Sequence, residues 1–257
     1  METKLIEVNG IHLSVKEAGN GPDMVLIHGK GYSKENMDRL FNNYKDRFHV
    51  VSYDVRGHGE SDKPEAFTFA DDVEDLYQLT IVLGLDKPIA IGFSMGSYIA
   101  LRTAEDHPGI FSKLVLIGTK PGGQSSIVTI QEEAKAKGLS AEETSKLILK
   151  CMFAPQVTFD DIKAFNKETA STVRLTAAQQ DAITESMNGM ELMSNIKKVE
   201  VPVLCLTGEY DGVNTPETAK QIADALPDGR LEVIPNAGHI AFFENPEKVF
   251  ECIDAFA

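Results

Sequence analysis

The segment IAIGFSMGSYIAL, residues 89–101, decides the fold of this chain of 257 residues. It opens with apolar residues, as a strand buried on both faces does, and closes with the apolar spacing of a buried helix. Between the two, Gly92 and Gly96 flank Ser94. A sharp turn from strand to helix requires residues without a Cβ at these two places, because the two elements nearly touch there. We therefore predict that Ser94 lies on such a turn, with its hydroxyl above the sheet and at the N-terminus of a helix.

Short apolar runs like the one before Ser94 recur along the chain and predict the other strands. They cover residues 23–27, 48–53, 88–93, 114–117, 201–206 and 231–234. Runs so continuously apolar are typical of parallel strands that are covered on both faces. At the N-terminus, residues 4–8 and 11–16 are joined by Asn9-Gly10, which is a two-residue hairpin signal. The pattern predicts an α/β fold whose sheet is mostly parallel, with an antiparallel edge at the N-terminus.

Helix-start signals fall between these strands. Each is a capping Ser, Thr or Asn, in several cases with proline next to it or an acidic residue three positions later. They predict helices that start after Ser33, Thr68, Thr215 and Asn245, together with one over residues 97–104.

Residues 122–199 depart from this alternation, because they contain no strand-like run. Three capping boxes begin amphipathic stretches in this region, at Ser140, Thr158 and Thr176. We predict an all-helical cap over residues 122–199, inserted between core segments 1–121 and 200–257. Methionines at helical spacing more often pack in a core than line a binding surface. Met187 and Met190 are nevertheless our candidates for side chains that contact an apolar ligand.

Composition excludes several classes of function. Lys plus Arg is 25 and Asp plus Glu is 39, and the resulting net charge of −14 disfavours binding to nucleic acids or to an anionic membrane surface. No apolar run approaches the roughly 20 residues of a transmembrane helix, and the N-terminus lacks the pattern of a signal peptide. Three widely spaced cysteines, without a CxxC pair, fit a reducing compartment. We expect a cytoplasmic protein that does not insert into membranes.

A serine hydroxyl needs a base before it can act as a nucleophile. His239 follows the run 231–234, and catalytic groups collect beyond strand ends in open α/β sheets. Asp211 follows the run 201–206 and is our candidate for the carboxylate that orients the imidazole, with Glu209 as the alternative. The chain order Ser94, Asp211, His239 is the one found on folds with this serine turn.

The other five histidines have simpler interpretations, and no two of them have metal-ligand spacing on a helix. We expect surface or packing roles for His12, His49 and His107, and structural hydrogen bonds for His28 and His58. We predict no metal site and no cofactor.

Acyl chemistry also needs donors for an oxyanion. The backbone N–H of Met95, next to Ser94, is one candidate, and the N–H of Lys30, in the glycine-flanked loop after the run 23–27, is the other. We expect the side chain of Lys30 to be a solvated loop group.

With these motifs in register, the chain resembles the α/β-hydrolase family. The resemblance covers nearly the whole chain and rests on His28-Gly29, residues 54–61 (DVRGHGES), residues 92–96 (GFSMG), residues 208–211 (GEYD) and Gly238-His239. It implies an eight-stranded core with a helical cap after the sixth strand, triad roles for Ser94, Asp211 and His239, and a structural turn over residues 56–61. Two positions depart from the common pattern: Lys30 replaces an apolar or aromatic residue, and Ser97 replaces glycine.

Within that family the residues point to the capped branch of serine esterases and lactonases. We expect hydrolysis of a small apolar ester or lactone by a monomer or homodimer. Carbon–carbon bond hydrolases, cofactor-free haloperoxidases and ligand receptors share the same triad and remain alternatives. Epoxide hydrolases and haloalkane dehalogenases use an aspartate at the position of Ser94, which argues against both.

Overall fold

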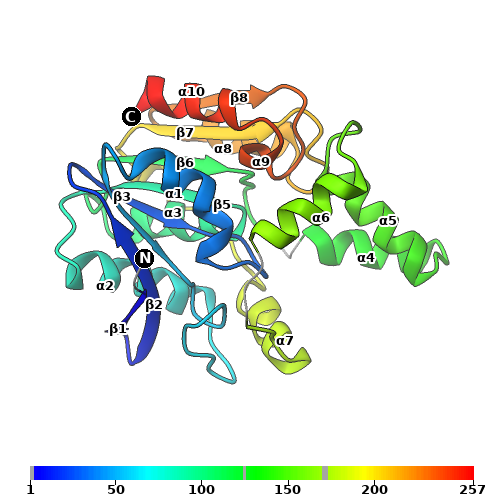
Figure 1. Cartoon of the computed structure of the whole chain (residues 1–257), viewed down its shortest axis with the longest axis horizontal. Helices are drawn as coiled ribbons and strands as arrows, with labels where there is room; N and C mark the ends of the chain where they lie inside the picture. The colour runs from blue at the N-terminus through cyan, green and yellow to red at the C-terminus, as the bar shows by residue number, and fades with distance from the viewer. Residues whose placement is uncertain (1–2, 124–125, 170–172) are drawn as a thin grey trace.

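A computed structural model describes residues 3–123, 126–169 and 173–257 of the chain. Its eight strands form one sheet in the order β1-β2-β4-β3-β5-β6-β7-β8 (Figure 1). The strands are β1 (Thr3–Val8), β2 (Ile11–Ala18), β3 (Asp23–Ile27), β4 (His49–Tyr53), β5 (Ile89–Phe93), β6 (Lys113–Ile117), β7 (Val203–Gly208) and β8 (Gly229–Ile234). Among the described strands, β2 runs antiparallel to both of its neighbours, β1 and β4, and every other neighbouring pair is parallel. The predicted fold class is therefore confirmed.

The antiparallel edge forms at the predicted hairpin. Asn9 and Gly10 both have positive φ, 45° and 76°, as a tight two-residue turn with the twist of a hairpin requires. The strand predicted to begin at residue 201 instead begins at Val203. Pro202 has no N–H to donate to the neighbouring strand, although its carbonyl accepts the N–H of Leu114.

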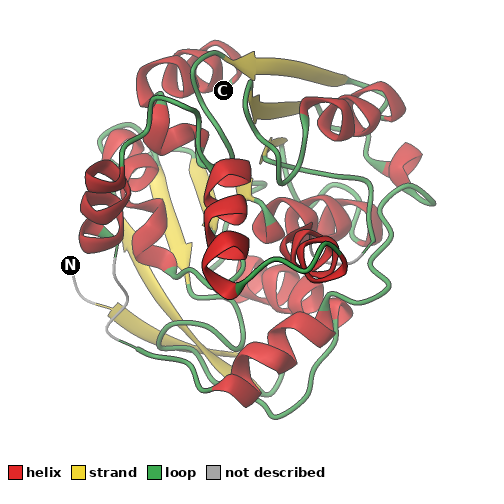
Figure 2. Ribbon diagram, turned by 90° about the vertical axis from the view of Figure 1, so that its right-hand side faces the viewer, coloured by secondary structure: helices red, strands yellow, loops and turns green. Residues whose placement is uncertain are grey.

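Helices cover both faces of the sheet (Figure 2). Side chains alternate along β3, so that Val25 and Ile27 join the apolar cluster on one face while Met24 and Leu26 join that on the other. The first face is covered by α2 (Phe69–Val82), α3 (Met95–Asp106) and α8 (Pro216–Ala225), and the second by α1 (Asp38–Tyr44), α9 (Ala241–Glu244) and α10 (Pro246–Phe256).

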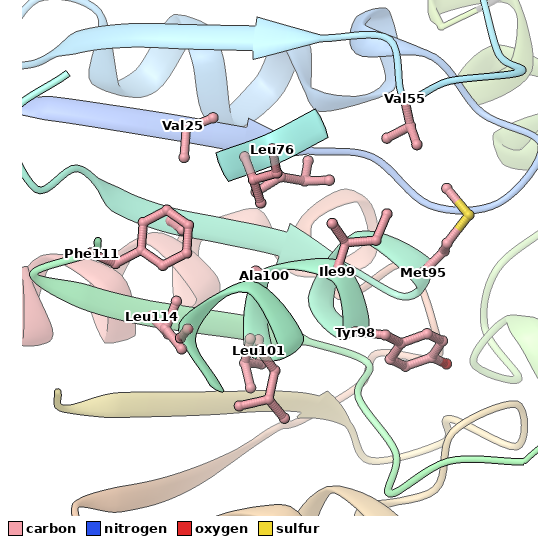
Figure 3. Packing of buried hydrophobic residues seen from close by; sticks show 14 of the residues in the cluster. Val25, Val55, Leu76, Met95, Tyr98, Ile99, Ala100, Leu101, Phe111 and Leu114 are labelled. Atoms are coloured by element: carbon pink, nitrogen blue, oxygen red, sulfur yellow. The ribbon is translucent and has the colours of Figure 1, made fainter. Parts of the chain in front are cut away.

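Helix α3 is fixed deep in the first cluster. Ile99, Ala100 and Leu101 are fully buried, and Figure 3 shows them among side chains that include Leu76 of α2 and Leu114 of β6. Burial of side chains such as Ile99 and Leu101 stabilises the fold by about 1.5–3 kcal/mol each. Because α3 begins directly after Ser94, this packing also fixes the position of the serine turn.

The helical insertion lies between β6 and β7 and projects from one end of the sheet (Figure 1). It comprises α4 (Ser126–Ala136), α5 (Ala141–Met152), α6 (Phe159–Glu168) and α7 (Ala177–Ser186). The capping boxes predicted at Ser140, Thr158 and Thr176 are all present. At its base, Gly122 forms an isolated antiparallel bridge with Glu191. Residues 124–125 and 170–172 of the predicted cap lie outside the described residues.

The described part of the chain also contains two short 3₁₀ helices, η1 (Lys34–Met37) and η2 (Ile196–Lys198). The helix predicted to start after Ser33 therefore begins with a 3₁₀ turn, η1, before α1. Within the described ranges, no helix is both long enough and apolar enough to cross a membrane.

Candidate active site

Ser94 lies between β5 and α3 in a strained backbone conformation. Its φ is 49° and its ψ is −116°, which a residue with a side chain adopts only at a cost of about 1–3 kcal/mol. The Ser94 N–H donates to the carbonyl of Ile117 at 2.8 Å, which holds the turn against β6. A Cβ on Gly92 would lie 2.3 Å from the carbonyl oxygen of Gly96, and one on Gly96 would lie 2.2 Å from that of Ile27. The turn therefore requires both glycines.

His239 and Asp211 come from the loops after β8 and β7 and meet beside this turn. Nδ1 of His239 lies 2.8 Å from Oδ2 of Asp211, and both residues are buried. The other carboxylate oxygen, Oδ1, accepts the N–H groups of Val213 and Asn214 at 2.9 and 2.8 Å. These two bonds fix the orientation of the carboxylate. The arrangement favours a proton on Nδ1 and leaves Nε2 as the acceptor of the ring.

Glu209, the alternative carboxylate, points elsewhere. It is exposed, and its Oε2 accepts the N–H of Asn236 at 3.1 Å. The structure thus brings Asp211, and not Glu209, to His239.

The C-terminus of α5 holds both of these loops. The N–H of His239 donates to the carbonyl of Met152 at 2.7 Å, and the N–H of Gly212 donates to that of Cys151 at 2.8 Å. The last carbonyls of a helix have no acceptor role within it, so they are free for such contacts. The insertion therefore supports the loops of His239 and Asp211 directly.

Tyr98, one turn along α3, is a site residue that the sequence analysis did not single out. Its hydroxyl accepts a hydrogen bond from Nδ2 of Asn214 at 2.5 Å and also interacts with the side chain of Ser94. Burial raises the pKa of Tyr98, so the phenol stays protonated at neutral pH. Asn214 also donates to the carbonyl of Gly118 at 2.6 Å. The loop of Asp211 is thereby connected to Ser94 through Asn214 and Tyr98.

Two buried histidines shape the loop that follows β3. The N–H of Gly31 donates to Nε2 of His58 at 3.1 Å, and Nδ1 of His58 lies 3.0 Å from the carbonyl of Arg56. Burial lowers the pKa of His58 to about 3, and burial also lowers that of His28. Both rings are therefore neutral and serve as the structural hydrogen-bonding groups that the sequence predicts.

The remaining histidines lie away from Ser94. His12 and His49 contact Asp62 and Asp23, and His107 stacks on Tyr77 with 3.7 Å between ring centroids. Among the described residues, no group of three or more His, Cys, Asp or Glu could hold a metal ion.

Two backbone N–H groups near Ser94 are available to a ligand. The loop of Lys30 follows β3, whose last residue, Ile27, pairs with Gly92 just before the serine turn. No described residue accepts a hydrogen bond from the N–H of Lys30. The N–H of Met95 is the first of α3, where helix geometry provides no acceptor. The two residues predicted as oxyanion donors therefore follow β3 and β5, which are neighbouring strands of the sheet.

A cavity of about 680 Å³ contains both Ser94 and His239. This volume lies within the range of sites for small molecules. Its walls include Phe93 from the core and Ile127 and Ile183 from the insertion.

Met187 and Met190, the two candidates for contact with an apolar ligand, differ in whether they border this cavity. Both are buried in the same apolar cluster of the core, but Met187 also lines the cavity, whereas Met190 does not border it. Met152, at the end of α5, also lines the cavity.

The expectation that Lys30 is a solvated loop group is wrong. Its half-buried side chain lines the cavity, and Nζ donates to Oγ1 of Thr184 on α7 at 2.7 Å. Burial lowers the pKa of this ammonium. The contact joins residues 154 positions apart, so only the folded insertion brings it about.

Comparison with known proteins adds to this geometry. The sequence profile described as the Alpha/beta hydrolase family matches residues 24–251. A pimeloyl-[acyl-carrier protein] methyl ester esterase of Nitrosomonas europaea is 26% identical to this chain, covering 95% of it and 98% of the esterase.

Two solved structures have similar folds. Est816, described as an N-acyl homoserine lactone degrading enzyme, has a TM-score of 0.86 at 22% identity, covering 99% of this chain and 100% of that one. The enol-lactonase from Burkholderia xenovorans LB400 has a TM-score of 0.85 at 22% identity, covering 98% of this chain and 99% of that one. At these identities the two structures establish a shared fold.

Proposed function

This chain belongs to the Alpha/beta hydrolase family, and we propose that it is a serine hydrolase that cleaves a carboxylic ester or a lactone through an acyl-enzyme on Ser94. The observation that carries the proposal is the 2.8 Å contact between Asp211 and His239 in the cavity that holds Ser94 on its strained turn. The esterase, the N-acyl homoserine lactone degrading enzyme and the enol-lactonase named above support this class of substrate.

Acylation begins when the Ser94 hydroxyl faces Nε2 of His239. Nε2 of His239 then takes the hydroxyl proton while Oγ forms a bond to the carbonyl carbon of the substrate. Asp211 keeps the ring in the required tautomer and stabilises the imidazolium that forms. The N–H groups of Lys30 and Met95 donate to the oxyanion. A donor in this position is worth about 10²–10³ in kcat.

The tetrahedral intermediate collapses when His239 gives its proton to the alkoxy oxygen and the carbon–oxygen bond breaks. From an ester the alcohol departs, whereas from a lactone it stays attached to the acyl group. Water then gives a proton to His239 and attacks the acyl carbon. The bond to Ser94 Oγ breaks, Oγ recovers the proton, and the free acid leaves.

We further propose that residues 122–199 act as a cap that selects the substrate, over a core formed by residues 1–121 and 200–257. Ile127, Ile183 and Met187 of this segment line the cavity together with Phe93 of the core. Such walls favour an apolar group next to the scissile carbonyl.

The test is a panel of p-nitrophenyl esters, lactones and dienoic ketones, assayed with the wild type, Ser94→Ala, His239→Ala and the double variant. Each single substitution should lower kcat by about 10⁴-fold or more, and the double variant should be hardly worse, because the triad acts as a unit. Ester hydrolysis that survives in Ser94→Ala would refute the proposal. Cleavage of dienoic ketones without cleavage of esters would instead assign the chain to the carbon–carbon hydrolases, and a single turnover per chain would indicate a receptor.

A further inference from the structure

We infer that the ammonium of Lys30 forms an anion subsite and that the substrate is an ester or lactone carrying a carboxylate. This inference rests on the function proposed above, because it names the substrate class of the same cavity.

The positive charge of Lys30 lies in the cavity that contains the reacting groups. Its backbone lies in the loop next to the serine turn, and its side chain lines the cavity that contains Ser94 and His239. Nζ has one described partner, Oγ1 of Thr184 at 2.7 Å. Thr184 donates its own hydroxyl proton to the carbonyl of Gln180 at 2.8 Å, so it contributes only a lone pair to Lys30. The ammonium can donate two further hydrogen bonds.

No carboxylate of the described residues balances this charge. Asp181 borders the same cavity, but it forms no ion pair with Lys30 within 4 Å. Burial alone accounts for the lowered pKa of Lys30, with no acidic neighbour opposing it. A half-buried ammonium without a counter-ion lowers stability relative to one that is paired.

Three lysines of the described residues are buried more deeply than Lys30; Lys120 donates to Oγ of Ser126 at 3.2 Å, and the other two contact carboxylates. Lys34 contacts Asp54 and Glu60, each at 2.9 Å, and Lys16 contacts Asp38. A chain with net charge −14 does not lack carboxylates for such pairs. We therefore expect the ligand to supply the negative charge that pairs with the Lys30 ammonium in this cavity.

A competing interpretation is that Lys30 only attaches the insertion to the core through Thr184. The two interpretations predict different effects of the charge of the substrate on the loss caused by a substitution at Lys30. A purely mechanical attachment affects charged and neutral substrates alike, whereas an anion subsite affects only the charged one.

The experiment compares isosteric ester pairs. Mono-p-nitrophenyl glutarate is paired with p-nitrophenyl 5-methylhexanoate, which replaces the carboxylate with an isopropyl group. A second pair, 4-acetoxybenzoate and 4-isopropylphenyl acetate, places the carboxylate on the alcohol side. The readout is the ratio of kcat/KM for the anionic ester to that for the neutral ester, in the wild type, Lys30→Met, Lys30→Arg and Thr184→Val.

In at least one pair the wild type should favour the anionic ester, and added salt should weaken this preference. Lys30→Met should lower the ratio by about 10- to 100-fold, the value of a charge-assisted hydrogen bond. Lys30→Arg should keep most of the preference, and so should Thr184→Val, which removes the attachment and retains the ammonium.

An absence of anionic preference in the wild type overturns the inference, even if Lys30→Met does not fold. Equal losses on both members of a pair, reproduced by Thr184→Val, also overturn it in favour of the mechanical attachment. Calorimetric binding of glutarate to Ser94→Ala separates the two proposals. Binding that weakens by about 10- to 100-fold when Lys30→Met is added supports the subsite even if no ester is hydrolysed.

Discussion

Asp211→Asn should abolish the proton transfer while leaving the fold intact. In the wild type Oδ1 accepts two backbone N–H groups, from Val213 and Asn214, and Oδ2 faces Nδ1 of His239. An asparagine must keep its carbonyl oxygen on the two backbone donors, which leaves its NH₂ facing Nδ1. The imidazole then carries its proton on Nε2 and cannot accept the one from Ser94. We expect a loss of about 10⁴-fold in kcat, or about 5.5 kcal/mol of transition-state stabilisation.

The assay is the steady-state hydrolysis of the best p-nitrophenyl ester, with thermal unfolding as the check on folding. Glu209→Gln is the matched control, because Glu209 is exposed and bonded only to the backbone of Asn236 among the contacts described. It should retain wild-type kcat. If Asp211→Asn stays within tenfold of the wild type, or if Glu209→Gln is the inactive variant, the assignment of the carboxylate is wrong.

Two further predictions follow from side chains around the site and in the core. Met187→Val should move the preferred acyl chain towards longer esters and change kcat/KM several-fold per methylene, because Met187 lines the cavity. Met190→Val, in the core, is its control, and equal substrate profiles for the two variants would show that Met187 only packs. Glu105→Gln should stabilise the chain at pH 8.5 more than at pH 5, measured by urea unfolding. Burial raises the pKa of Glu105 to about 8, so between pH 4.5 and 8 the folded chain binds more protons than the unfolded chain and loses stability as the pH rises. An equal gain at both pH values would contradict this reasoning.

Local signals in the sequence predicted the elements whose determinants lie a few residues apart. The turn at Asn9-Gly10 and the capping boxes at Ser140, Thr158 and Thr176 all formed as expected. The 3₁₀ turn after Ser33 was not predicted. There the N–H and Nζ of Lys34 both bind Asp54, at 2.7 and 2.9 Å, and this partner lies 20 positions away.

The location of the candidate site followed from topology. Parallel strands end at one edge of the sheet, so the serine turn and the two loops were expected to meet there. The contacts of Lys30 with Thr184 and of Asn214 with Tyr98 span 154 and 116 positions. They depend on how the insertion and the loops fold over that edge, and no local pattern in the sequence encodes this.

The central claim is that Ser94 is the nucleophile, and covalent labelling tests it most directly. A fluorophosphonate reacts with a serine only when a base activates it. After digestion and mass spectrometry, we expect one label per chain, located on Ser94, absent from Ser94→Ala and strongly slowed in His239→Ala. A label on another residue, or equal labelling of Ser94→Ala, would contradict the account.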